Sequence, residues 1–273
     1  MYFSSLLRLL AAVSAIGIAG CGGGGDSTPA PRAAAECFNP ALYGAGPTTT
    51  YQLDYQQLGS NFRFSRIVTA APNGQVGGLV TERRNEWINP VNPDGPPTGT
   101  ALLTTLYGTD GRDVLTTVEE ANRLVVTTLN GVVRTYQTST RTVYDPAKRD
   151  PRYNLAQGES YVITARHSDT ATENITLNGA GNTVTSGFVS ETSTVTYVGQ
   201  ETITVPAGTY QACRFEVTLP ILTGTVIYYP PETFTTVWVA KDKGVMLRGD
   251  RKDAISFAST VLTGTSRLNG API

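Results

Sequence analysis

The chain has 273 residues, with 21 lysines and arginines against 22 aspartates and glutamates, so its formal net charge is −1. This balance supplies no concentrated basic surface and argues against a nucleic-acid partner. The sequence contains one histidine, His167, and three cysteines, so neither a metal centre nor a cofactor is predicted.

The first twenty-one residues have the features of a secretory signal that ends at a cysteine. Arg8 provides a basic start, residues 9–18 form an apolar run, and two small residues precede Cys21. The tetrapeptide Ile18-Ala19-Gly20-Cys21 resembles the lipobox of bacterial lipoproteins. That resemblance implies that residues 1–20 are removed, that Cys21 is alkylated with diacylglycerol, and that its new amine receives an acyl chain such as palmitate.

The anchor is expected to hold the protein at the outer membrane. Position 22 is glycine, whereas an aspartate there would resemble an inner-membrane retention signal of enteric bacteria. The domain is then expected in the periplasm or at the cell surface. A signal peptide without lipid is the alternative, and a transmembrane helix is disfavoured because the apolar run is shorter than the roughly 20 residues that a bilayer requires.

After the signal, the composition predicts a linker followed by one domain. Residues 21–47 contain the lipidated cysteine and a Gly/Ala/Pro-rich linker, and residues 48–273 form a single all-β domain. The first strand is indicated by Tyr51, Leu53 and Tyr55, which alternate with polar residues as in a strand with one buried face.

The region from 100 to 144 has the most regular pattern. Leu-Thr-Thr or Val-Thr-Thr triplets recur about every 11 or 12 residues, and turn-forming sequences lie between them at 108–111, 120–122 and 130–131. This spacing predicts an up-and-down antiparallel meander. The proline-rich segment 89–99 is a predicted loop, either a plain connection or a contact for a ligand or a partner. The charged segment 145–157 is a predicted loop with its charges in solvent, and the alternative is an anion-binding role.

His167 is in phase with Ile163 and Ala165 on a predicted strand, and Asp169 follows two residues later. Such a pair is suited to acid–base chemistry. No serine or cysteine nucleophile lies in a recognisable motif, so the chain is not expected to be an enzyme. An enzyme would require polar groups that converge in a cleft, with His167 or several carboxylates among them.

The two cysteines outside the lipobox, Cys37 and Cys213, would lie in an oxidising compartment, where a disulfide between them is possible. Alternatively, Cys213 is a small buried residue and Cys37 is a free thiol near the tether.

Residues 199–250 predict two hairpins. The first turns at the sequence Val-Pro-Ala-Gly-Thr-Tyr, residues 205–210, and the second places Trp238 before a charged turn. This arrangement is similar to uncharacterised periplasmic and lipoprotein domains, and it resembles the half-barrel of the LolA/LolB lipoprotein carriers, whose concave face holds acyl chains. The resemblance implies a large, curved, mostly antiparallel sheet, half-barrel or sandwich-like. Those carriers close the concave face with helices, whereas no substantial helix is predicted here after the signal peptide.

The expected function is a non-enzymatic binding module for a hydrophobic ligand or an envelope partner. Phe215, Val217 and Trp238 are the candidate ligand-facing residues, and Tyr228 and Tyr229 would form an aromatic rim. The alternative is a structural or interaction scaffold without a pocket, in which the first three side chains pack against another sheet and the two tyrosines belong to a partly buried strand.

Overall fold

The computed structural model describes residues 34–73, 77–87, 96–129, 132–176, 182–218, 220–224, 234–252 and 257–273, all within one compact unit, Pro31–Ile273. Strands dominate these ranges, and the all-β prediction is confirmed. The described helices are short 3-10 turns: η1 (Ala34–Cys37), η2 (Pro40–Tyr43) and η3 (Arg152–Asn154). No helix in the described ranges is long and apolar enough to cross a membrane.

The first eight strands follow one another in the sheet, and most are long. They are β1 (Thr49–Gln57), β2 (Arg63–Pro72), β3 (Gly78–Trp87), β4 (Gly99–Asp110), β5 (Asp113–Leu129), β6 (Val132–Asp150), β7 (Ser160–Thr176) and β8 (Asn182–Val205). The remaining strands are shorter: β9 (Gly208–Val217), β10 (Ile221–Gly224), β11 (Thr236–Ala240), β12 (Met246–Lys252), β13 (Phe257–Leu262), β14 (Arg267–Leu268) and β15 (Ala271–Pro272).

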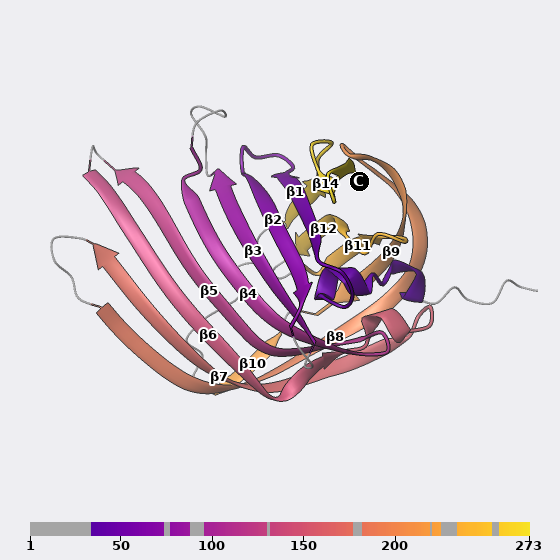
Figure 1. The fold of residues 1–273 in the computed structure, drawn as a ribbon, viewed down its shortest axis with the longest axis horizontal. Coiled ribbons are helices and arrows are strands. Elements are labelled where there is room, and N and C mark those ends of the chain that lie inside the picture. Colours follow the sequence, from indigo (N-terminus) through magenta and orange to yellow (C-terminus); the bar gives the residue numbers. More distant parts are fainter. Residues whose placement is uncertain are drawn as a thin grey trace, which may run out of the picture. The chain divides into compact units, whose positions relative to one another are not determined.

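The sheet closes on itself. Its order is β13-β12-β11-β9-β8-β7-β6-β5-β4-β3-β2-β1, and β1 then pairs with β13. The closing register aligns Tyr55 with Leu262 and Gln57 with Thr260. The predicted curved sheet is therefore a closed antiparallel barrel of twelve strands. Figure 1 shows the long strands β4 to β8 side by side, with β10 paired to β8 beside them.

The predicted meander is present, but one of its turns is not. β5 runs without interruption through residues 120–122, where the sequence indicated a hairpin turn. These polar residues are accommodated in the strand because they face partners on β6: Arg141 Nη1 lies 2.6 Å from Glu120 Oε1, and Ser139 donates a hydrogen bond to Asn122 at 2.7 Å. Cross-strand pairing thus overrides the local turn propensity.

The segment 145–157 was predicted as a loop, but most of it is regular structure. β6 continues to Asp150, and η3 follows directly. The charged side chains are paired: Arg149 contacts Asp113, and the guanidinium of Arg152 lies 2.6 Å from Asp150. Arg149 therefore joins the end of β6 to β5, and Arg152 joins η3 to the last residue of β6.

The chain before β1 packs against the inner side of the sheet. The predicted linker extended to residue 47, whereas Ala34 and Cys37 are fully buried. η1 contacts β8 and β9, and η2 contacts β2, β3 and β4, so the two helices bridge opposite walls. The approach of η2 requires glycine at Gly78, because a Cβ atom there would lie 1.8 Å from the carbonyl oxygen of Tyr43.

The interior contains apolar clusters and paired charges. One cluster surrounds Phe215, Tyr153 and Tyr197, and another joins residues of β1 and β2 to β11–β13. On β3, Glu82 and Glu86 are buried in the same phase as Val80. The Glu82 carboxylate lies 2.5 Å from the Arg66 guanidinium, so this buried charge is neutralised within the barrel.

Candidate functional site

A cavity of about 470 Å³ lies against the inner side of β5–β8. Along each strand, the residues that line the cavity alternate with residues that face outward, as expected for a closed sheet. Titratable and hydroxyl side chains form one part of the lining. This polar wall comprises Glu119, Thr142, Tyr144, Lys148, Asp150, Arg152, His167, Asp169, Glu191 and Ser193.

His167 and Asp169 are the centre of the polar wall. Both occupy the inner phase of β7, and their side chains are only 8% and 7% exposed. His167 donates from Nδ1 to Asp169 Oδ1 at 2.7 Å, and the hydroxyl of Thr142 donates to the same oxygen at 2.8 Å. This hydrogen bond fixes the ring orientation and leaves Nε2 as the atom available for other contacts.

Glu191, on β8, lies on the other side of His167. The Nε2 atom of His167 is 3.8 Å from Glu191 Oε2, which is beyond hydrogen-bond distance. The second carboxylate oxygen of Glu191 is 2.5 Å from Lys148 Nζ. Glu191 of β8 therefore lies between Lys148 of β6 and His167 of β7.

Tyr144 connects this group to Glu119. Its hydroxyl donates to Glu119 Oε2 at 2.9 Å, and its ring centroid is 5.2 Å from that of His167. Burial raises the pKa of Tyr144 well above its ordinary value, and the negative charges of Glu119 and Glu191 raise it further. Tyr144 is therefore a neutral donor at physiological pH.

Aromatic residues separate the cavity from the filled part of the interior. The Tyr43 hydroxyl, from η2, lies 3.1 Å from the Tyr153 hydroxyl. Burial is the main cause that raises the pKa of each of these two tyrosines. Tyr153 in turn packs edge-on against Phe215 at a centroid distance of 5.9 Å. The segment before β1 thus supplies part of the cavity wall.

Another part of the lining is apolar and lies beside the polar wall, since Leu222 of β10 pairs with Glu191 of β8. It comprises Leu222, Val217 at the end of β9, Val237 of β11, and Pro220 and Phe234, which lie just before β10 and β11. We call these five residues the apolar rim. Polar and apolar surfaces therefore face one cavity, which is the arrangement that a ligand with two chemically different ends requires.

The candidate ligand-facing residues have different positions. Val217 lines the cavity, whereas Phe215 is fully buried in the core cluster with Tyr153. Trp238 is 8% exposed, and the guanidinium groups of Arg214 and Arg248 lie 5.7 and 4.9 Å from its ring centroid. Tyr228 and Tyr229 lie outside the described residues.

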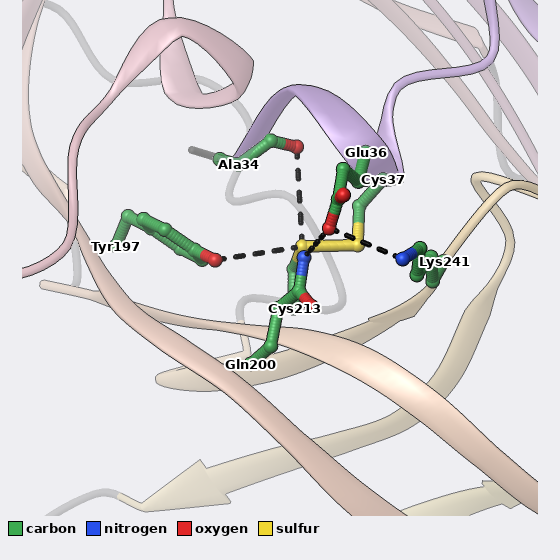
Figure 2. Close-up of a disulfide and its surroundings, with 7 residues drawn as sticks. All are labelled: Ala34, Glu36, Cys37, Tyr197, Gln200, Cys213 and Lys241. Atoms are coloured by element: carbon green, nitrogen blue, oxygen red, sulfur yellow. Dashed lines mark hydrogen bonds and ion pairs between the residues drawn. A yellow bond between two sulfur atoms is a disulfide. The ribbon is translucent and has the colours of Figure 1, made fainter. Parts of the chain in front are cut away.

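Cys37 and Cys213 form a disulfide that attaches η1 to β9 (Figure 2). Its surroundings hold it in place: the Tyr197 hydroxyl lies 4.0 Å from the Cys213 sulfur. Glu36 accepts a hydrogen bond from Gln200, and its carboxylate lies 3.3 Å from Lys241 Nζ. Cys21 and the lipobox lie outside the described residues.

A second cleft, of about 740 Å³, lies beside β1 and β2. Its described lining includes two oppositely charged side chains, Asp54 and Arg63. Asp54 accepts hydrogen bonds from Gln52 and Thr265, and Arg63 stacks over Trp87 at 4.8 Å. We consider the first cavity the better candidate site because its lining brings four carboxylates, two cations and His167 together. Among the described residues, no group of three or more histidine, cysteine or acidic side chains is placed to hold a metal ion.

Sequence reasoning missed most of the polar wall. Tyr144 and Glu191 were not singled out, although Glu191 shares the buried phase of β8 with Val189 and Ser193. Glu119 was considered only as the neighbour of Glu120, and Lys148 only as part of the charged segment 145–157. A charged residue within an otherwise buried phase is the signal that was available. The partners come from different strands, so their proximity became evident only with the register.

The fold and site thus define a closed antiparallel barrel with a partly polar interior cavity. Residues 182–255 match the family described as "Protein of unknown function (DUF3108)". This match spans β8 to β12 and includes the hairpins at 199–250; Glu191 lies within it and His167 before it. Comparison of the chain with curated proteins and with solved structures gave no match.

Proposed function

We propose that the β-domain is a non-enzymatic binding module for a hydrophobic ligand that carries a polar end. The observation that carries this proposal is the cavity of about 470 Å³, whose lining contains both the polar wall and the apolar rim. An apolar chain would lie along Leu222 and Phe234, and the polar end would meet the side chains around His167. A segment of an envelope partner that has both an apolar and a polar part would fit the same cavity.

The location in the cell is a further part of the proposal. The basic start, apolar run and lipobox-like Ile18-Ala19-Gly20-Cys21 support a lipoprotein anchored by diacylglycerol and palmitate at Cys21. Gly22 supports the outer membrane over the inner one. The likeness of residues 199–250 to the LolA/LolB carriers supports an apolar ligand. An anchored carrier or sensor would then act within the cell envelope.

One observation favours the second candidate, a scaffold without a ligand. Phe215 and Trp238 pack into the core rather than line the cavity, as a scaffold requires. The polar wall also meets one requirement of acid–base catalysis. We assign binding instead because His167 Nε2 faces the carboxylate of Glu191 rather than a hydroxyl or thiol nucleophile.

The test is native mass spectrometry of the chain secreted with Cys21→Ala behind an ordinary signal peptide. We expect a co-purifying mass that organic solvent removes and that added lipid restores. Leu222→Asp, on the apolar rim, should abolish it. The matched control is Ile221→Asp, because Ile221 is the preceding residue of β10 and is 69% exposed. A wild-type mass unchanged after incubation with lipid would support the scaffold instead, and equal loss in both variants would refute the assigned site.

A further inference from the structure

The polar wall of the cavity carries an excess of negative charge. Four carboxylates face two permanently cationic side chains, which leaves a formal charge of −2 when the histidine is neutral. The carboxylates belong to Glu119, Asp150, Asp169 and Glu191, and the cations to Lys148 and Arg152. The stretches between the described ranges, such as 225–233, contain neither lysine nor arginine in the sequence.

Two of the carboxylates are neutralised by ion pairs. Lys148 Nζ lies 2.5 Å from Glu191, and Arg152 lies 2.6 Å from Asp150. These pairs use the two cations of the lining, and each cation is committed to its own partner.

The other two carboxylates have no ion pair with the lysine or the arginine of the described lining. Glu119 accepts from the neutral phenol of Tyr144, and Asp169 accepts from Thr142 and His167. The raised pKa of Tyr144 is a second indication of the negative potential, since Glu119, Glu191 and Asp169 all contribute to it after burial. A bound cation would relieve this potential.

The geometry also supplies a pair of acceptors for a donor group. In the neutral tautomer that donates from Nδ1 to Asp169, His167 has a lone pair at Nε2, and this atom is 3.8 Å from Glu191 Oε2. Two acceptors at this separation can both receive hydrogen bonds from one group placed beside them. An ammonium group has three donors, which suits this pair and a further carboxylate.

From these observations we infer that the cavity recognises amphiphiles whose polar end is a primary amine. The ammonium group lies beside His167 Nε2 and Glu191 Oε2, within hydrogen-bond distance of both and within the field of Glu119 and Asp169, and the apolar chain lies along the apolar rim. This inference rests on the proposed binding function and specifies its ligand class. Anionic amphiphiles such as fatty acids are disfavoured by the same charges.

The test compares three probes with the same twelve-carbon chain: dodecylamine, dodecanoate and dodecyl maltoside. Each is titrated below its micelle concentration at pH 7 into the secreted Cys21→Ala chain, with binding measured by calorimetry. We expect dodecylamine to bind about tenfold more tightly than dodecanoate. Glu119→Gln, which keeps an oxygen acceptor for Tyr144, should weaken dodecylamine about tenfold and leave dodecyl maltoside unchanged. Glu120→Gln is the matched control, because this adjacent residue pairs with Arg141 on the opposite face.

The outcomes separate this inference from the proposed function. Equal affinity for the three probes would overturn the amine preference while the binding function stands. Tighter binding of dodecanoate would also overturn it and would direct attention to Arg123 of β5, which pairs with Glu86 and whose side chain is 39% exposed. Failure of every probe to bind would refute the proposed function itself. If Glu119→Gln and Glu120→Gln change the affinity for dodecylamine equally, the polar wall does not recognise the amine.

Discussion

Removal of the Cys37–Cys213 disulfide should destabilise the domain strongly. The two cysteines are 176 residues apart, so the bond restricts a large loop of the unfolded chain. The chain-entropy model assigns about 5 kcal/mol to a loop of this size, and native disulfides typically contribute about 2–5 kcal/mol. Because both cysteines are fully buried, we choose the double variant Cys37→Ala/Cys213→Ala, which leaves no free thiol in the core.

The expected loss corresponds to a fall in melting temperature of roughly 5–20 °C for a domain of this size. Circular dichroism melts should compare the oxidised protein, the reduced protein and the double variant. Reductant should lower the melting temperature of the first and have no effect on the last. Glu36→Gln, which removes the ion pair with Lys241 beside the disulfide, should cost less than about 1 kcal/mol. A shift below about 2 °C in the double variant would refute the entropic reasoning.

Three further predictions concern the core and its titration. Gly78→Ala should destabilise the domain by roughly 3 kcal/mol or more in urea unfolding, since its Cβ would meet the Tyr43 carbonyl oxygen; an unchanged midpoint would contradict this contact. Phe215→Ala should cost about 3–5 kcal/mol because the ring is fully buried, and a loss below about 1 kcal/mol would place Phe215 outside the core. Burial raises the pKa of Tyr51 to about 12, so its contribution to stability is complete below pH 10 and is lost as the pH rises towards 12. The urea midpoint should therefore fall between pH 10 and pH 12, and a constant midpoint across this range would disagree with that burial.

Local periodicity was sufficient for the strands but not for the closure of the sheet. The alternation of Tyr51, Leu53 and Tyr55 correctly predicted β1 and its buried face. The pairing of Tyr55 with Leu262 joins opposite ends of the domain, and nothing in a window of ten residues specifies it. A curved sheet was predictable, whereas its closure depends on twist and curvature summed over twelve strands.

The charged residues that face the interior could not be predicted from the sequence for a different reason. On β3 both phases are polar, since Glu82 and Arg84 alternate with Thr81 and Arg83, and a period of two does not then reveal the buried face. Burial of Glu82 depends on Arg66 from the neighbouring strand. The polar wall follows the same rule: the phase of His167 was visible in the sequence, but its partner Glu191 comes from β8.

The contrast between the two parts of the interior favours binding over a solid scaffold. Around Phe215, Tyr153 and Tyr197 the interior of the barrel is filled with side chains, many of them aromatic. Beyond Tyr43 the lining changes to titratable groups around a cavity. Buried ion pairs seldom stabilise a fold more than apolar residues of the same volume. Packing alone therefore does not explain the polar wall. Binding of a ligand would explain it, because the polar end of the ligand would replace its hydrogen bonds to water with hydrogen bonds to these side chains.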